Sequence, residues 1–347
     1  MSLDARLQRL WYGPEWRSVP LWPLAMVFRV VLAVRSAMFR LGVFRTAHPG
    51  VPVVVVGNVT VGGTGKTPVA AWVAQQLKRR GHRAGVVLRG YGARHRGAPR
   101  VVQLSDNAAD VGDEALVHVR HGAHVVVIGA DRLAAARLAR EQGADVIVSD
   151  DGLQHLRLER DVELVVVDAA RGLGNGWLLP AGPLREPASR VESVHALIRT
   201  QRNSSDEVPL AVRGPLRVTA RLVLGDAVNL STGERRVLSA FATQRDVHAV
   251  AGIGHPEAFF AGLAGAGLVA TLHALPDHAG LEHGHLPFPA GATVLMTEKD
   301  AVKCAHFAEP GWWWVELRVE VDRNDTALLV GCVLERAGLV GAGAGLG

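Results

Sequence analysis

Short, continuous apolar runs recur along the chain, separated by helical or polar stretches. The run at residues 51–56 (VPVVVV) leads through a glycine-rich segment into a helical stretch over residues 69–80. An uninterrupted apolar run is typical of a strand buried on both faces of a parallel sheet. Further strands are expected at residues 84–88, 124–128, 146–148 and 164–167. Because these strands alternate with helices, the pattern predicts a doubly wound α/β domain.

A second α/β pattern follows a polar stretch at residues 199–208 (RTQRNSSDEV), which we interpret as a linker. Its expected strands lie at residues 247–251 and 293–296, and the chain ends in VGAGAGLG. The expected organisation is therefore an N-terminal helical segment (1–48), the doubly wound domain (49–205), a smaller α/β domain (206–335) and a flexible tail (336–347).

The N-terminal segment combines an apolar helix with basic charge. Residues 19–34 read VPLWPLAMVFRVVLAV, with Arg29 as the single charge, which is shorter than the roughly 20 apolar residues of a spanning helix. Tryptophans at positions 11, 16 and 22 favour a headgroup region. We expect an interfacial helix that lies on a membrane rather than spanning it, with no cleavable signal peptide. A helix packed on the protein's own core is the alternative.

Charge is concentrated in the same segment. The chain has 38 Lys+Arg, 33 Asp+Glu and a net charge of +5, and residues 1–50 alone hold seven arginines against two acids. The remaining 297 residues are therefore neutral overall, which argues against a nucleic-acid-binding body. Two cysteines, Cys304 and Cys332, exclude a disulfide framework and a cysteine-rich zinc site. Only four lysines occur, at positions 66, 78, 299 and 303.

The glycine-rich segment after the first strand carries the strongest chemical signal. Gly65-Lys66-Thr67 matches the end of the phosphate-loop pattern, although Thr60 occupies the position of its first glycine. In such a loop, backbone N–H groups surround phosphate oxygens, the lysine bridges the terminal phosphates and the hydroxyl ligates Mg²⁺. An ordinary glycine-rich turn is the alternative. We therefore predict a P-loop NTPase-like domain whose nucleotide contacts are Asn58, Gly62, Gly63, Thr64, Gly65, Lys66 and Thr67.

Acidic residues follow two of the expected elements. Asp150 and Asp151 end an apolar strand, where paired carboxylates can orient Mg²⁺, although acids there can also cap a helix. Asp113 and Glu114 begin an apolar helical run, and on their own they indicate only a helix cap.

Histidines and a lysine-containing motif give weaker signals. The histidines at 118, 121 and 124, and those near His278, lack the spacing of a metal site, and we interpret the first group as surface or core residues. Residues 297–303 (TEKDAVK) only loosely resemble a guanine-reading motif, so GTP specificity is not supported.

Taken together, these motifs resemble the tetraacyldisaccharide 4′-kinase (lipid A 4′-kinase) family. The resemblance runs from the N-terminal apolar segment to about residue 320. It is carried by GNVTVGGTGKTP (57–68), LRGYG (88–92), GDE (112–114), GADR (129–132), SDDGLQH (149–155), RGLGNGWLLPAGPLREP (171–187), GIGHPEAFF (252–260), PDH (276–278) and TEKDAVKC (297–304). It implies an enzyme that transfers the ATP γ-phosphate to the 4′-hydroxyl of a tetraacylated glucosamine disaccharide 1-phosphate.

The resemblance also implies site roles. Asp113 would be the general base in a dyad with His278, beside the catalytic Lys66. Thr67, Glu114, Asp150 and Asp151 would hold Mg²⁺ next to ATP, and Arg132 and Arg185 are candidate substrate contacts. This chain departs from the family at Ala279, where a second histidine commonly follows Asp-His.

The implied setting is the cytoplasmic face of the bacterial inner membrane, reached as a peripheral or monotopic protein. Anionic lipids and the lipid disaccharide would be the partners, with no nucleic acid and no obligate protein partner. Two alternatives remain at this stage: a phosphate-loop GTPase or metallochaperone, and a non-catalytic membrane-associated nucleotide-binding module.

Overall fold

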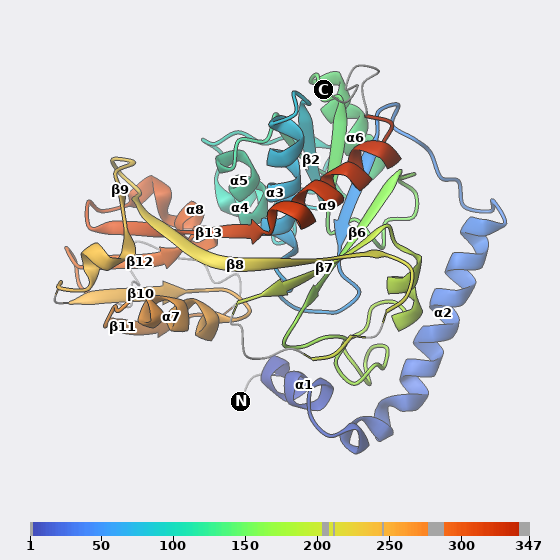
Figure 1. The fold of residues 1–347 in the computed structure, drawn as a ribbon, viewed down its shortest axis with the longest axis horizontal. Coiled ribbons are helices and arrows are strands. Elements are labelled where there is room, and N and C mark those ends of the chain that lie inside the picture. Colours follow the sequence, from blue (N-terminus) through green and yellow to red (C-terminus); the bar gives the residue numbers. More distant parts are fainter. Residues whose placement is uncertain (1–2, 203–207, 211, 245, 277–287, 340–347) are drawn as a thin grey trace.

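The fold is organised around one continuous sheet. The computed structural model describes residues 3–202, 208–210, 212–244, 246–276 and 288–339. The strand order is β11-β10-β12-β13-β8-β7-β6-β1-β5-β2-β4-β3, with β9 paired to β8 (Figure 1). The strands are β1 (Val53–Gly57), β2 (Ala84–Leu88), β3 (Arg100–Val101), β4 (Val125–Ile128), β5 (Val146–Asp150), β6 (Val162–Asp168), β7 (Ala196–Gln201), β8 (Leu216–Asn229), β9 (Arg235–Arg236), β10 (Val247–Ala251), β11 (Thr271–Ala274), β12 (Thr293–Thr297) and β13 (Trp312–Val321).

The half of the sheet from β7 to β4 is parallel and covered on both faces, as the apolar runs predict. The four residues at 53–56 of β1 are fully buried between β5 and β6. Helices α3, α5 and α9 contribute to the apolar core on one face, and α6 contributes to the core on the other. These helices span Lys66–Lys78 (α3), Asp113–Arg120 (α5), Arg132–Glu141 (α6) and Arg323–Arg336 (α9), and α4 spans Ala108–Val111. The doubly wound α/β prediction is confirmed.

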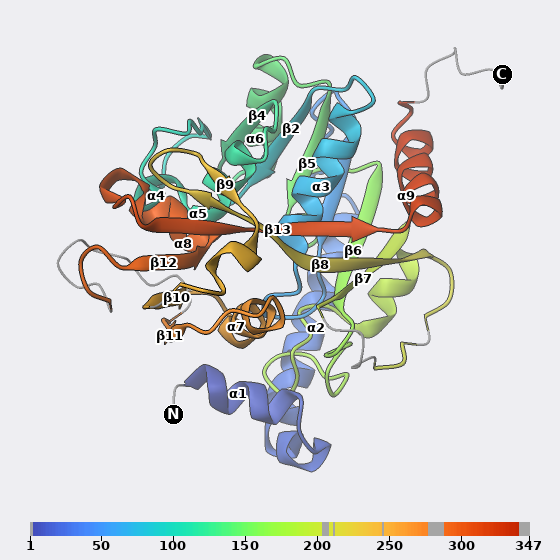
Figure 2. The same cartoon turned by 60° about the vertical axis from the view of Figure 1, so that its left-hand side comes forward.

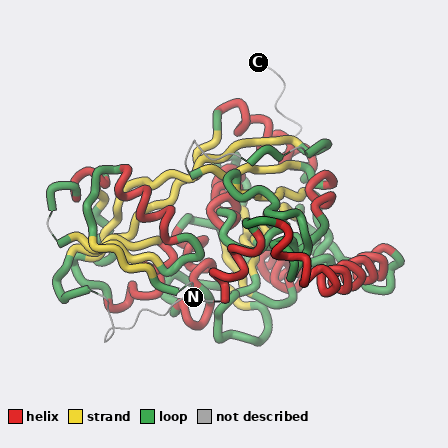
Figure 3. Tube along the Cα trace, turned by 90° about the horizontal axis from the view of Figure 1, so that it is seen from below, coloured by secondary structure: helices red, strands yellow, loops and turns green. Residues whose placement is uncertain are grey.

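The long strand β8 connects the two halves of the sheet. Its first residues pair in parallel with β7, and its later residues pair antiparallel with β13. Beyond β13, strands β12, β10 and β11 are parallel and pack with α7 (Pro256–Gly265), α8 (Glu298–Cys304) and two 3₁₀ turns, η3 (Leu238–Phe241) and η4 (Ala305–Phe307). Viewed from below, the strands form two groups joined by this long strand (Figure 3).

Two expectations about domain organisation need adjustment. The stretch expected to begin a linker at residue 199 instead completes β7, because Arg199, Thr200 and Gln201 pair with β8. Helix α9 was assigned to the second domain, but its buried Leu329 and Val333 belong to the core that contains α3. Figure 2 shows β13 leading back from the second half of the sheet to this helix. The boundary near residue 205 thus falls between two strands of one sheet, and the two-domain division stays a prediction.

The N-terminal segment forms α1 (Leu3–Trp11), the 3₁₀ turn η1 (Glu15–Leu21) and α2 (Trp22–Arg40). Residues 16–40 make one helical stretch long and apolar enough to cross a membrane by length and composition, although the same stretch would suit an interfacial helix. Figure 3 shows α2 running out along the edge of the molecule. The helix is therefore longer than the apolar run predicted.

Helix α2 has two different faces. Ala25 is fully buried, Phe28 and Leu32 pack on the apolar core, and the Arg35 guanidinium donates to the carbonyl of Gln154 at 2.7 Å. The opposite side exposes large apolar side chains at Leu24, Met26, Val27, Val30, Val31 and Val34. An apolar face turned to solvent is the signature of a surface that another apolar phase covers.

Candidate active site

The phosphate loop lies between β1 and α3, as predicted. Gly62 and Gly65 have φ of +113° and +81°, a left-handed conformation that side chains rarely adopt. The buried Asn58 amide donates to the Thr64 hydroxyl at 3.1 Å and braces the loop internally. Thr60, at the position of the first glycine, forms an antiparallel bridge with Leu184 and is not among the residues with positive φ, so its backbone does not require glycine. The residues expected to surround phosphate are therefore arranged as a loop.

Lys66 and Asp151 face each other at the start of α3. The Lys66 ammonium lies 3.9 Å from the Asp151 carboxylate, which also receives Arg185 at 2.8 and 3.3 Å. Burial alone would raise the pKa of Asp151, but these two cations lower it to about 2. Asp151 is therefore a fixed negative charge next to Lys66.

Asp150 ends β5 in a dry environment. Its Oδ2 contacts His118 Nε2 at 2.9 Å, and both side chains are only 1% exposed. Burial opposes ionisation, but the hydrogen bond from His118 and the nearby charges of His118 and Lys66 hold the pKa of Asp150 below its ordinary value. Its other oxygen, Oδ1, is buried and has no hydrogen-bond partner within the described ranges. A buried acceptor of this kind is suited to a ligand or its water shell.

Asp113 and Glu114 open helix α5 at the phosphate loop. The preceding Gly112 has φ of +88°. Asp113 is 5% exposed and its Oδ1 accepts the Glu114 N–H at 2.8 Å. The Thr67 hydroxyl donates to Glu114 Oε1 at 3.4 Å, which joins two motifs that are far apart in sequence. The structure therefore brings the pair assigned by family resemblance to the expected magnesium hydroxyl.

The two candidate substrate arginines differ in their surroundings. Arg132 is 3% exposed at the start of α6, donates to the Gly129 carbonyl at 2.7 Å, and has its pKa lowered to about 10 by burial. Arg185 is bound to Asp151 and donates to the Asn58 carbonyl at 3.0 Å. Arg185 therefore braces the phosphate loop in this structure. His278 lies outside the described residues.

Three further residues, His118, Lys299 and Lys303, lie near the acids, and none of them was among the predicted site residues. His118 was expected to be an ordinary surface or core histidine, yet it contacts Asp150. Lys299 lies 2.7 Å from Glu114, and Lys303 lies 3.8 Å from Asp113. The scarcity of lysine had already marked the last two as notable, but the sequence did not indicate which acids they would contact.

The donor set fits magnesium bound together with a nucleotide. Within the described part of the chain, no group of three or more His, Cys, Asp or Glu residues could hold a metal unaided. Magnesium usually takes one or two carboxylates and completes its shell with phosphate oxygens and water. The Thr67 hydroxyl, the adjoining Glu114 and the unpartnered oxygen of Asp150 match that requirement.

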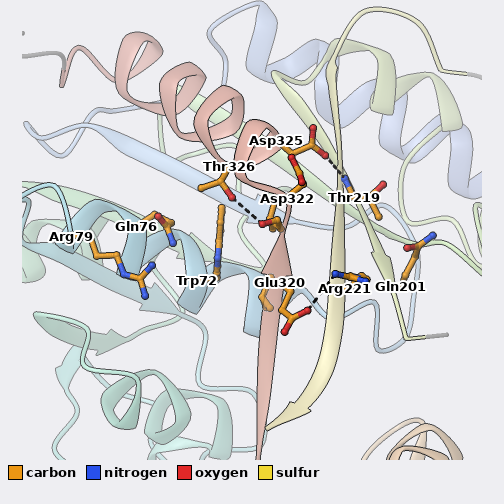
Figure 4. A pocket seen from close by; sticks show the side chains of 12 residues that line it. Trp72, Gln76, Arg79, Gln201, Thr219, Arg221, Glu320, Asp322, Asp325 and Thr326 are labelled. Carbon is orange, nitrogen blue, oxygen red and sulfur yellow. Dashed lines mark hydrogen bonds and ion pairs between the residues drawn. The ribbon is translucent and has the colours of Figure 1, made fainter. Parts of the chain in front are cut away.

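A separate cavity of about 560 Å³ lies between α3, β8, β13 and the start of α9 (Figure 4). Trp72, Arg79 and Arg221 line it together with acids, and Arg221 is 3.6 Å from Glu320. No predicted site residue lines this cavity. Its lining carries charges of both signs, and it is not lined by the phosphate loop.

Comparisons with known proteins give matches over most of the chain. A family model described as tetraacyldisaccharide-1-P 4′-kinase matches residues 17–333. The tetraacyldisaccharide 4′-kinase of Pseudomonas paraeruginosa is 47% identical over 316 residues, covering 91% of this chain and 93% of its own. That of Thiobacillus denitrificans is 47% identical over 318 residues, covering 90% and 94%. A crystal structure of LpxK from Aquifex aeolicus in complex with ATP has a TM-score of 0.79 at 24% identity, covers 92% of this chain and 99% of its own, and shows the shared fold.

Proposed function

Because the chain belongs to the tetraacyldisaccharide-1-P 4′-kinase family, we propose a role in the reaction for each of its site residues. The protein is an ATP-dependent kinase that phosphorylates the 4′-hydroxyl of a tetraacylated glucosamine disaccharide 1-phosphate in lipid A biosynthesis. The GTPase, metallochaperone and non-catalytic alternatives do not fit a chain that matches this family over nearly its whole length. The observation that carries the residue assignment is the contact between Thr67 of the phosphate loop and Glu114 beside Asp113.

Asp113 is the proposed general base. As the 4′-oxygen forms its bond to the γ-phosphorus, the hydroxyl proton passes to the Asp113 carboxylate, and the bond between the γ-phosphorus and the bridging oxygen of ADP breaks. Lys66 supplies positive charge to the phosphates during transfer. His278 is proposed as the imidazole partner of the base, by family motif.

Mg²⁺ is proposed to bind at Thr67, Glu114, Asp150 and Asp151. When bound, it neutralises phosphate charge and aligns the β- and γ-phosphates. Within the protein, His118 fixes one oxygen of Asp150, and Arg185 and Lys66 fix Asp151. These contacts hold the two acids in position before the reaction begins, and electrostatic catalysis depends on charged groups that are already in place.

The exposed apolar face of α2 supports a membrane-bound setting. We propose that it lies in the cytoplasmic face of the inner membrane, where anionic lipids attract the arginines of the N-terminal segment. Trp22 stacks on Trp177 at 4.5 Å, so the segment is packed against the catalytic body. A kinase held this way would meet a lipid substrate without extracting it from the bilayer.

Replacing the base tests the assignment. Asp113→Ala should lower turnover by roughly 10²- to 10⁴-fold, the usual contribution of a general base, while ATP binding measured by calorimetry changes little. Asp110→Ala, three residues earlier and outside the proposed site, is the matched control and should keep normal turnover. If Asp113→Ala kept near-normal turnover, the base would have to be another group.

A further inference from the structure

Helix α8 brings two lysines to the paired acids of α5. The helix spans only Glu298–Cys304, yet it contains half of the lysines in the chain. It comes from the half of the sheet that lies beyond β13, whereas the acids belong to the phosphate-loop half. Nothing in the mechanism above uses Lys299 or Lys303.

Lys299 shares a carboxylate oxygen with the phosphate loop. Its ammonium lies 2.7 Å from Glu114 Oε1, and the same oxygen accepts the Thr67 hydroxyl at 3.4 Å. The two side chains of this ion pair are 27% and 19% exposed. A positive group thus lies at the carboxylate oxygen that adjoins the hydroxyl expected to ligate Mg²⁺.

Lys303 is held differently. Its ammonium lies 3.1 Å from Asp300 and 3.8 Å from Asp113. Asp300 is fully buried and also accepts the Gly252 N–H at 2.9 Å and the Thr297 hydroxyl at 2.6 Å. Because Asp300 anchors it, Lys303 is a fixed neighbour of the base.

We propose that Lys299 is a positioning residue that acts as a resident counter-ion on Glu114, and that it leaves this oxygen when the metal–nucleotide complex binds. The proposal rests on the assignment of Glu114 and Thr67 to the magnesium site. Two adjacent carboxylates repel each other at the mouth of the phosphate loop, and an ammonium on a flexible stem neutralises one of them. A divalent cation competes with that ammonium for the same oxygen.

Competition predicts the sign of a binding change. Lys299→Met removes the competing charge, so Mn²⁺ with ADP, followed by electron paramagnetic resonance, should bind roughly fivefold more tightly than to the wild-type chain. Lys299→Arg retains the charge and should bind close to wild type. Unchanged or weaker binding to Lys299→Met would overturn the proposal, and weaker binding would assign Lys299 to the nucleotide itself.

A control variant separates competition from packing. His121, which directly follows α5, contacts Glu298 of α8 at 2.9 Å, so His121→Gln removes another link between the same two segments without touching the acid pair. It should leave Mn²⁺–ADP affinity unchanged, and an equal effect of both variants would indicate loosened packing and refute the counter-ion role. Mn²⁺–ADP binding is measured without the lipid, whereas a failure of the proposed function would be seen as absent phosphate transfer to the disaccharide. The failure of the counter-ion proposal and the failure of the proposed function are therefore separate results.

Discussion

Arg185 offers the sharpest test of how the phosphate loop is supported. Its guanidinium makes two hydrogen bonds to Asp151, at 2.8 and 3.3 Å, and one to the Asn58 carbonyl at 3.0 Å. It therefore joins the second acid of the β5 motif to the start of the loop. Arg185→Met keeps most of the aliphatic stem and removes these three bonds together with a fourth, which Arg185 donates to the side-chain oxygen of Asn58.

The expected magnitude follows from these contacts. Hydrogen bonds to charged groups contribute about 1.5–3 kcal/mol when well buried. The two side chains are 24% and 34% exposed, and solvent screening reduces the loss of unfolding free energy to roughly 2 kcal/mol. Misplacing a supporting group of this kind typically costs about 10- to 100-fold in activity. Without Arg185, the pKa of Asp151 should rise from about 2 toward its ordinary value, so its negative charge would be lost at a higher pH on acidification.

The assay compares two arginines. Arg190, 20% exposed, pairs with Glu163 and lies 3.3 Å from Glu186, and among the described residues these acid partners lie outside the phosphate loop. Arg190→Met should lose a similar unfolding free energy in urea titrations but keep a normal kcat/KM for ATP, while Arg185→Met should lose both. If Arg185→Met lost stability but kept wild-type kcat/KM, the bracing role would be refuted.

Three further predictions follow from single features. His118→Leu leaves the buried Asp150 carboxylate without its partner and should cost about 3–5 kcal/mol of unfolding free energy in urea, whereas a shift below 1 kcal/mol would show that the pair is not a buried charge contact. Glutamine at Val27 and Val30 should abolish sedimentation with anionic vesicles without changing ATP affinity, and retained sedimentation would place the membrane contact elsewhere. Burial raises the pKa of Cys304 to about 12, so iodoacetamide at pH 8 should label this thiol only after unfolding. Mass spectrometry can detect the label, and rapid labelling of the native protein would contradict the burial of Cys304.

The hydrophobic pattern predicted those strands whose apolar residues form one short, continuous run. The strands at residues 53–57 and 146–150 were predicted from apolar runs at 51–56 and 146–148, because strands covered on both faces are apolar throughout. Strand β8 was not predicted: buried and exposed positions alternate along its first half but not along its second half. Helix α9 packs against α3 from more than two hundred residues away, and no boundary argument based on composition could place it there.

The site likewise contains residues that the sequence could predict and contacts that it could not. Lys66 and Thr67 belong to one contiguous motif, whose spacing reflects backbone geometry. The pairing of Lys299 with Glu114 spans 185 residues and depends on how α8 packs against α5, so it became visible only in the folded chain. His118 looked like any other histidine in a helix until β5 placed Asp150 beside it.

The central claim is that this chain moves phosphate from ATP to a lipid disaccharide. The most direct measurement incubates the full-length protein with γ-labelled ATP, Mg²⁺ and tetraacyldisaccharide 1-phosphate in mixed micelles, and locates the label in the lipid. We predict a second phosphate on the 4′-oxygen, ATP preferred over GTP, and loss of labelling in Asp113→Ala. ATP consumption with no label on the lipid, or a preference for GTP, would contradict the account.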